Sequence, residues 1–318
     1  MKTISLLDTT ISDYNLGNQI IMDAVNNIMN EIFQDDFIFR LQYAEKFGKQ
    51  SLSYIRKSDY TFFGGTNSLS SQMNKYSQMG FKLTDLIYIR NKLILLGIGW
   101  WQYQLKPNTY TMFFLNNLLS KNTLHSVRDS YTKLMLENIG ILNVINTSCP
   151  TTWNLTVEHC MQIPSTKSEN VLITLTDYNQ SKEWDEKLLE LVFSNYKKVF
   201  YWIQGSGDLA YINSFTNIDR NKLNIISPRL HLYDEILKNE DVDYIGTRLH
   251  AGIRAIQNKK KSLILAIDNR AKEISKDINL NTADRDDLLS VSNFISNNYK
   301  TELNIPFGNI ETWKGQFR

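Results

Sequence analysis

The chain has 318 residues, of which 42% are hydrophobic and 12% aromatic, enough to bury two cores of ordinary domain size and too apolar for a disordered protein. Its 35 basic and 33 acidic residues leave a formal charge of only +2, which argues against a protein built to grip nucleic acid backbones. No apolar run approaches the ~18 residues that a transmembrane helix needs, and none predicts a signal peptide.

The first half of the chain predicts strands that alternate with helices. Helical periodicity covers 19–32 and returns at 131–138. Short β-branched or aromatic runs predict strands at 3–7, 36–41, 60–63, 93–96 and 142–145. This alternation is typical of βα units and parallel sheets, so the predicted fold class is α/β.

A polar stretch at 161–170 separates this half from a new buried-strand pattern at 171–176. We place the domain boundary there, with one domain over 1–165 and a second over 166–318. The second half predicts a final amphipathic helix at 288–299, and further strands, each followed by a helix, at 199–203, 224–226, 243–245 and 263–267. The simplest architecture is two Rossmann-like domains that face a central cleft.

The junction after the strand at 243–245 is the most informative one, because parallel sheets bind ligands beyond the carboxyl ends of their strands. Gly246 permits a tight turn, and Arg248 and His250 then fall in the first turn of a helix. Two cations there oppose the helix dipole. An anionic ligand would reverse that cost, but pairing with Asp243 or Asp241 would also remove it, and the residues alone leave both explanations open.

Other junctions carry weaker signals. Arg128 precedes a helix that begins at Ser130, where it could bind a carboxylate or phosphate or simply pair with Asp129. Asp177 and Gln204 also follow second-domain strands and are weaker candidates for the site. The remaining histidines are interpreted as structural or surface residues: His125, His159 and His231.

Several polar, glycine and aromatic positions in the first half are candidates for the cleft. Asn15 and Asn18 could hydrogen-bond a sugar or only cap a helix. Gly64 and Gly65 could let a ligand approach the backbone or only form a tight turn. Trp100 could stack on a sugar face, with core packing as the alternative.

Cysteine content sets a further limit on the chemistry. Cys149 and Cys160 are the only two cysteines, so a disulfide framework is excluded and a zinc-binding spacing is missing. We therefore expect a cytoplasmic protein without a metal or an organic cofactor.

Together these junctions resemble the polysaccharide pyruvyl transferase family, whose members look like two-domain glycosyltransferases of the GT-B type. The similarity is carried by Tyr-Asn-Leu-Gly-Asn at 14–18, Gly-Gly-Thr at 64–66, Arg-Asp-Ser at 128–130, Arg-Leu-His at 248–250 and Ile-Asp-Asn-Arg at 267–270. It departs at 17–19, where Gly-Asn-Gln replaces the family's usual Gly-Asp-Glu, and at Thr66, where a third glycine is common.

The resemblance implies transfer of a pyruvyl group from phosphoenolpyruvate to a sugar as a ketal. It assigns donor binding to Arg128, Gly246, Arg248, Leu249 and His250, with Arg248 and His250 as the catalytic pair. It assigns the acceptor side or cleft to Asn15, Gly17, Asn18, Gly64, Gly65 and Trp100.

The implied acceptor is a sugar that is lipid-linked or nucleotide-linked, and nucleic acid is not an expected partner. Peripheral association with the inner face of the cell membrane would fit a lipid-linked acceptor. Two alternatives remain open at this point. One is a GT-B glycosyltransferase that uses a nucleotide sugar, and the other is an inactive homologue that only binds sugar or phosphate.

Overall fold

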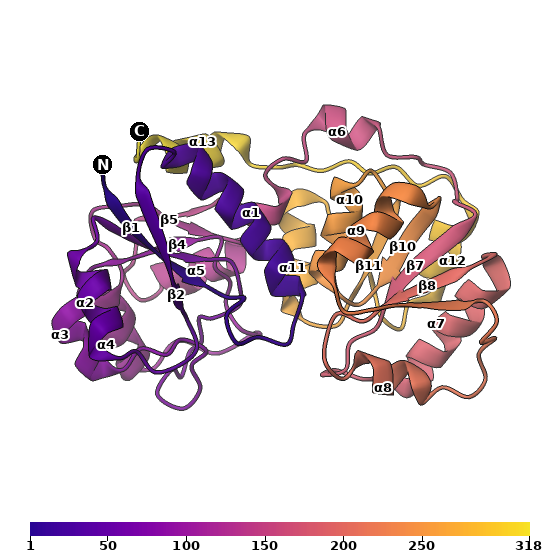
Figure 1. Ribbon diagram of the computed structural model, residues 1–318, viewed down its shortest axis with the longest axis horizontal. Helices are drawn as coiled ribbons and strands as arrows, with labels where there is room; N and C mark the ends of the chain where they lie inside the picture. The colour runs from indigo at the N-terminus through magenta and orange to yellow at the C-terminus, as the bar shows by residue number, and fades with distance from the viewer. The chain divides into compact units, whose positions relative to one another are not determined.

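The computed structural model describes residues 1–318 as two compact units (Figure 1). Unit 1 comprises residues 1–13, 21–153 and 305–318, and unit 2 comprises residues 14–20 and 154–304. These units differ from the predicted limits of 1–165 and 166–318. The chain passes from unit 1 to unit 2 after residue 153, residues 14–20 belong to unit 2, and residues 305–318 belong to unit 1. Burial explains why residues 305–318 belong to unit 1: Trp313 has no exposed surface and packs edge-to-face on Phe62 of that unit.

Unit 1 is built on a parallel sheet with the strand order β2-β1-β3-β4. Its strands are β1 (Thr3–Asp8), β2 (Phe37–Gln42), β3 (Tyr60–Gly64) and β4 (Leu93–Leu96). A short parallel pair, β5 (His125–Val127) and β6 (Val144–Asn146), joins beside β4 through a bridge between Ile98 and Val127. The predicted strands are confirmed, although the one expected at 142–145 starts two residues later.

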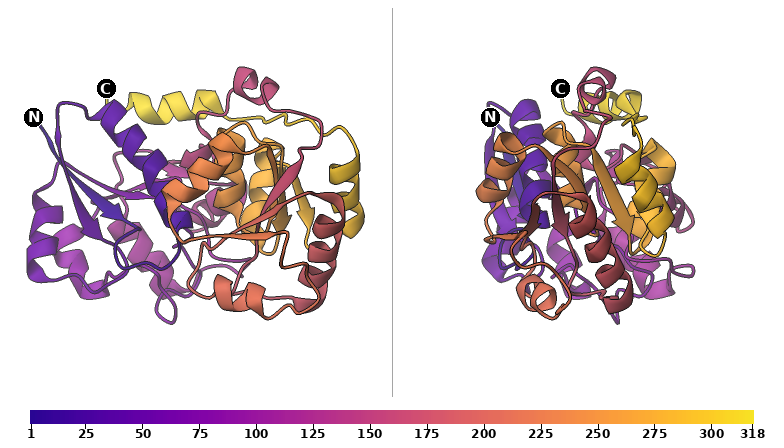
Figure 2. Two further views of the ribbon diagram at one scale, coloured as in Figure 1. Left: turned by 45° about the vertical axis from the view of Figure 1, so that its right-hand side comes forward. Right: turned by 90° about the vertical axis from the view of Figure 1, so that its right-hand side faces the viewer.

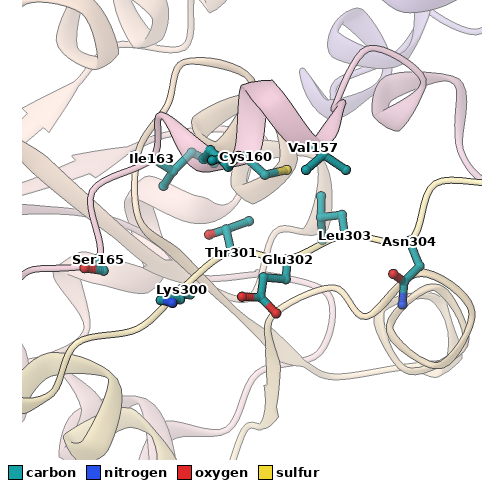
Figure 3. Close-up of a pocket in the computed structure, with 10 residues that line it drawn as sticks. Val157, Cys160, Ile163, Ser165, Lys300, Thr301, Glu302, Leu303 and Asn304 are labelled. Carbon is teal, nitrogen blue, oxygen red and sulfur yellow. The ribbon is translucent and has the colours of Figure 1, made fainter.

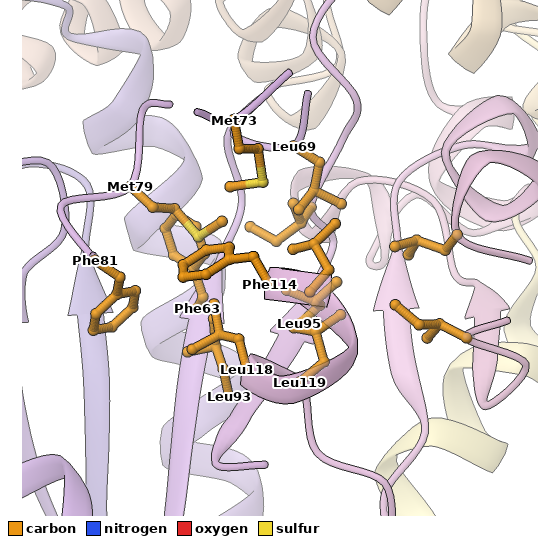
Figure 4. Close-up of a cluster of buried hydrophobic side chains, with 14 of the residues drawn as sticks. Phe63, Leu69, Met73, Met79, Phe81, Leu93, Leu95, Phe114, Leu118 and Leu119 are labelled. Carbon is orange, nitrogen blue, oxygen red and sulfur yellow. The ribbon is translucent and has the colours of Figure 1, made fainter. Parts of the chain in front are cut away.

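The helical elements of unit 1 surround this sheet. They are α1 (Gly17–Ile32), which enters unit 1 from Ile21 onward, α2 (Lys49–Lys57), η1 (Leu83–Asp85), α3 (Leu86–Ile89), α4 (Thr109–Leu118), α5 (Ser130–Glu137), η2 (Pro150–Thr152) and α13 (Phe307–Gly315). Phe63 and Leu95 of the sheet meet Phe114 of α4 in a buried apolar cluster (Figure 4). No helix of the protein is long and apolar enough to cross a bilayer.

Unit 2 contains a six-stranded parallel sheet with the order β12-β11-β10-β7-β8-β9. Its strands are β7 (Asn170–Thr174), β8 (Val199–Trp202), β9 (Leu223–Ile226), β10 (Val242–Gly246), β11 (Ser262–Ala266) and β12 (Thr282–Asp284). The chain builds outward from β7 first to one side and then to the other, which is the doubly wound dinucleotide-binding order. The order therefore reverses between the neighbours β7 and β10.

Helices of unit 2 precede, connect and follow these strands. They are α6 (Val157–Met161), α7 (Lys182–Asn195), α8 (Asp208–Asn213), α9 (Leu230–Asn239), α10 (Leu249–Gln257), α11 (Asn269–Ile278) and α12 (Leu288–Ser296). The helix predicted at 288–299 is confirmed as α12, but it is not the final one, because α13 follows it in unit 1. Strands β7 and β10 are buried along their whole length, as expected for a parallel sheet covered on both faces.

Candidate functional site

Four polar side chains gather where the strand order of unit 2 reverses. Asp177 follows β7, Gln204 and Asp208 follow β8, and Arg248 follows β10. We call these four residues the switch-point cluster. The carboxyl ends of strands at such a reversal are the usual ligand-binding place of an open α/β sheet.

Arg248 is the centre of the switch-point cluster. Its side chain is only 3% exposed, and its Nη2 donates to Asp177 Oδ1 at 3.0 Å and to Asp208 Oδ1. Of the two explanations that the sequence left open, carboxylate pairing is therefore present, but the partners are Asp177 and Asp208 and neither Asp241 nor Asp243. The buried Nε of Arg248 nevertheless has no hydrogen-bond partner, which leaves one donor of this guanidinium unused.

The two carboxylates also fix the loop that follows β8. Asp208 Oδ2 accepts from the backbone N–H groups of Gln204 at 3.0 Å and Gly205 at 2.8 Å. Asp177 Oδ2 accepts from the Gly207 N–H at 3.0 Å. Burial raises the pKa of the Asp208 carboxyl, while the Arg248 guanidinium beside it opposes that rise. Arg248 thus holds both of the groups that shape this loop.

The loop before α1 lies against the same place. Asn15 Oδ1 accepts from Gln204 Nε2 at 2.8 Å, and the Leu16 N–H donates to the Gln204 carbonyl at 3.0 Å. A Cβ at Gly17 would lie 2.7 Å from Gln204 Nε2, so this close approach favours glycine. Gln204 Oε1 is buried without a hydrogen-bond partner. The predicted acceptor residues Asn15 and Gly17 therefore do adjoin the switch-point cluster.

A second guanidinium lies close to the cluster. The ring of Tyr178, which is 55% exposed, has Arg248 at 5.2 Å from its centroid and Arg270 at 5.9 Å. Arg270 also bonds the Tyr178 hydroxyl and pairs with Asp268, the N-cap residue of α11. The carboxyl end of β11 therefore adds a cation to this region, and the segment after β7 adds an exposed aromatic ring.

His250 occupies the second position of α10 and is 7% exposed. Arg248 is the N-cap residue of that helix, and its side chain does not cap the helix. The first N–H groups of a helix favour an anion. Close packing explains the glycine at position 246, because a Cβ there would lie 2.5 Å from Thr174 Oγ1 of β7.

Arg128 belongs to unit 1 and is equally buried, with 1% of its surface exposed. Its Nε donates to Asp129 Oδ2 at 3.2 Å and its Nη2 to Asn67 Oδ1 at 3.0 Å. The pairing with Asp129 that the sequence left open is therefore present. The guanidinium lies over Gly99, where a Cβ would come within 2.1 Å of Nη2.

Three other unit 1 candidates have structural explanations. Trp100 has no exposed surface, and its Nε1 donates to Gln104 Oε1 at 3.0 Å within unit 1, so the proposed cleft role for Trp100 is corrected to core packing. Gly64 and Gly65 form the tight turn after β3, and α1 packs directly on both of them.

Alanine at Gly65 should destabilise the protein by about 2–4 kcal/mol. The residue has φ +59°, and a Cβ would lie 1.9 Å from Ile21 Cγ2 of α1, so left-handed strain of roughly 1 kcal/mol adds to overpacking of about 1–3 kcal/mol. Gly140 is the matched control, since its φ is +85° but nothing lies within 4 Å. Urea unfolding would contradict this account if the two alanine variants lost equal stability.

The other histidines are confirmed as structural or surface residues. His125 is fully buried; its Nδ1 accepts from the Leu95 N–H, its Nε2 donates to the Ser120 carbonyl, and burial lowers its pKa to about 4. His159 donates to the carbonyl of Ile256 at 2.8 Å. His231 is exposed on α9. No group of three or more His, Cys, Asp or Glu side chains is arranged to hold a metal ion.

Two pockets of unit 2 lie apart from Arg248 and His250. The larger, of about 620 Å³, lies between α6 with the segment after it and residues 300–304 (Figure 3). Cys160, Ile163 and Leu303 supply its apolar lining. A smaller pocket of about 370 Å³ adjoins the carboxyl ends of β11 and β12 and is lined by Trp184, Lys272 and Arg285 among others. Neither is lined by a residue that the sequence had assigned to donor or acceptor binding.

Asp208 is the site residue that sequence inspection missed. It has no exposed surface, yet it pairs with a cation forty positions later in the chain. A usable signal was present, because Asp208 follows the Gly-Ser-Gly turn after a predicted strand, where a carboxylate can accept from free N–H groups.

Comparison with known proteins adds a family and a fold. A family model described as "Polysaccharide pyruvyl transferase" matches residues 15–269. The chain is also similar to UDP-GlcNAc 2-epimerase of Methanocaldococcus jannaschii solved with UDP-GlcNAc and UDP, at 12% identity and TM-score 0.58 over 99% of this chain and 98% of that one. Another structure of the M. jannaschii epimerase gives 13% identity and TM-score 0.52 over the same shares. These likenesses identify a GT-B-like α/β fold. Among curated proteins, none matches.

Proposed function

Because this chain belongs to the polysaccharide pyruvyl transferase family, we propose that it transfers a pyruvyl group from phosphoenolpyruvate to two hydroxyls of a sugar during surface polysaccharide synthesis. One observation carries the proposal beyond the family itself: the ends of β7, β8 and β10 bring the switch-point cluster to the N-terminus of α10, next to His250. That is where a sheet of this order binds an anionic ligand.

The reaction sets clear demands on such a site. The CH₂ carbon of phosphoenolpyruvate gains a proton, and two sugar hydroxyls form C–O bonds to the adjacent carbon. The C–O bond between that carbon and the phosphate group breaks, and phosphate leaves. Of the two protons that the sugar hydroxyls lose, one replaces the proton added to the CH₂ carbon and the other leaves with phosphate. No redox step is involved, so we propose that the protein needs no cofactor.

The chain offers groups for each demand. We assign the donor's charged groups to Arg248, to Arg128 and to the first turn of α10, with Gly246 and Leu249 shaping the turn. Guanidinium groups bind carboxylate or phosphate as a fork, at roughly 1.5–3 kcal/mol for each charged contact. His250 is assigned to proton transfer, because an imidazole can act as both acid and base near neutral pH.

The carboxylates around Arg248 make the affinity for the donor depend on pH. An anion placed beside Asp208 would disfavour its charged form, and burial already raises the pKa of that carboxyl. Donor binding is then coupled to proton uptake, so affinity falls as pH rises.

On the acceptor side, Asn15, Gly17 and Asn18 are assigned to sugar hydroxyls. We propose a lipid-linked or nucleotide-linked sugar and a cytoplasmic protein at the inner face of the membrane.

A nucleotide-sugar glycosyltransferase is the second candidate, since the fold is shared with proteins solved with UDP. Titration calorimetry separates the two. We expect phosphoenolpyruvate to bind without any nucleotide and to raise the melting temperature, whereas a nucleotide-sugar glycosyltransferase would respond to UDP and not to phosphoenolpyruvate. Binding of UDP alone would overturn the donor assignment, and binding of neither would favour an inactive homologue.

The direct test is product formation. The protein is incubated with phosphoenolpyruvate and a panel of nucleotide-linked and lipid-linked sugars, and mass spectrometry follows the acceptor. The expected result is one acceptor that gains a pyruvate ketal while phosphate is released in equal amount. Sugar transfer from a nucleotide donor in the same panel would replace this proposal with the glycosyltransferase.

A further inference from the structure

Residues 46–121 of unit 1 carry a concentrated positive charge that the balanced totals of the whole chain conceal. They contain ten Lys or Arg side chains and only two acidic ones, Asp59 and Asp85. Nine of the ten cations are exposed, and none of the ten forms an ion pair. Both acids already accept from backbone N–H groups, Asp59 from Thr3 at 2.7 Å and Asp85 from Lys82 at 2.8 Å.

Packing of three helices brings together the chain segments that carry many of these cations. α2 contacts α3, and α3 contacts α4, and the three lie together in both Figure 1 and the left view of Figure 2. Lys92 Nζ donates to the Ser58 carbonyl after α2 at 3.0 Å, and the Lys92 N–H donates to the Leu118 carbonyl of α4 at 3.1 Å. The neighbouring cations on the three chain segments are Arg56, Lys57, Arg90 and Lys121.

The same elements expose large apolar and aromatic side chains. Ile87 of α3 is 82% exposed and Phe113 of α4 is 57% exposed. Tyr54 of α2, Leu83 of η1 and Tyr88 of α3 are each more than 40% exposed. We call these five side chains, with the five cations at 56, 57, 90, 92 and 121, the α2–α4 face.

Helix stability accounts for only part of this composition. Arg56 and Lys57 lie in the last turn of α2, where cations suit the helix dipole. Lys49, however, lies in the first turn of α2, where a cation is disfavoured. Exposed Ile87 and Phe113 add nothing to the core of unit 1. The pattern is that of a surface with an external partner.

We propose that the α2–α4 face docks on an anionic lipid bilayer. Basic side chains attract anionic headgroups, and exposed aromatic and aliphatic side chains enter the boundary between headgroups and acyl chains. A nucleic acid partner would leave Ile87 and Phe113 without an apolar environment. A two-fold dimer through this face would bring its unpaired cations against their own copies. The proposal concerns where the protein docks rather than which bond it forms, so its test needs no substrate.

The test is co-sedimentation of the full-length protein with phosphatidylglycerol–phosphatidylcholine vesicles and with pure phosphatidylcholine vesicles. We expect binding to the anionic vesicles only, weakened by salt because the surface charges are screened. Glutamate at Lys57, Arg90 and Lys121 together should lower partitioning about tenfold or more. Ile87→Gln should lower it by a smaller factor without changing its salt dependence.

Matched variants control for net charge and for folding. Glutamate at Lys182, Lys198 and Lys238 makes the same charge change at exposed sites in unit 2, and Leu289→Gln removes a side chain that is 72% exposed there. These controls should bind like the wild type, with all variants melting at similar temperatures. Failure of the wild-type protein to bind anionic vesicles, equal losses in the controls, or equal binding to neutral vesicles would each overturn the proposal.

Discussion

Replacing Arg248 with methionine is expected to lower the free energy of unfolding by about 3–5 kcal/mol, because it leaves the carboxylate of Asp208 buried without its cation. Asp208 has no exposed surface and Arg248 is 3% exposed, so water cannot take over the lost interaction. The loop after β8 also loses its anchor, since Asp177 and Asp208 both bond Arg248 and the loop backbone. Chemical unfolding followed by circular dichroism would measure the loss.

A second Arg–Asp pair, between Arg254 of α10 and Asp234 of α9, provides the control. Arg254 bonds both oxygens of Asp234 at 2.8 and 2.7 Å, but the two side chains are about one-fifth exposed, so Arg254→Met should cost about 1 kcal/mol or less. Combining Arg248→Met with Asp208→Asn removes the stranded charge and should restore part of the stability. Equal losses at Arg248 and Arg254, or no recovery in the double variant, would contradict the role of a buried ion pair.

Substitution of His250 by glutamine should lower kcat by about 10²–10⁴ while the fold is retained, because an amide cannot exchange a proton with the substrate near neutral pH. The assay is phosphate release from phosphoenolpyruvate with a competent acceptor, measured between pH 5 and 9. The wild-type profile should show a limb on the side where the residue that transfers the proton changes its charge. The residual activity of His250→Gln should lack that limb.

His231→Gln serves as the matched control, because His231 is exposed on α9 and is assigned no role in the reaction. Its kcat and pH profile should equal those of the wild type. If His250→Gln lowered the melting temperature strongly and kept its pH limb, the residue would have a structural role, and proton transfer would have to be assigned elsewhere.

The strands and most of the helices could be predicted because each is a local pattern. The buried runs at β1, β4 and β7 and the apolar stripe of α1 lie within single stretches of chain. The alternation of strands with helices predicted the parallel sheets. The position of Arg248 at the start of α10 followed from the same local pattern.

What could not be predicted depends on pairs that are distant in the chain. The partners of Arg248 lie forty and seventy-one positions away, so an unpaired cation and a buried ion pair looked the same in the sequence. Trp100 illustrates the same limit, because an aromatic side chain beside a turn suits a sugar site and a core equally well. The charge of residues 46–121 was visible in the sequence, but it disappears when acids and bases are counted over the whole chain.

The return of residues 305–318 to unit 1 has a consequence for synthesis on the ribosome. Phe317 and Trp313 pack with Phe33, Tyr60 and Phe62, and each of the five rings contacts at least two of the others in edge-on or tilted pairs. Unit 1 therefore cannot complete its core during translation until unit 2 has been made. A nascent chain that stalls inside unit 2 would expose this aromatic gap, which makes it a recognisable substrate for chaperones.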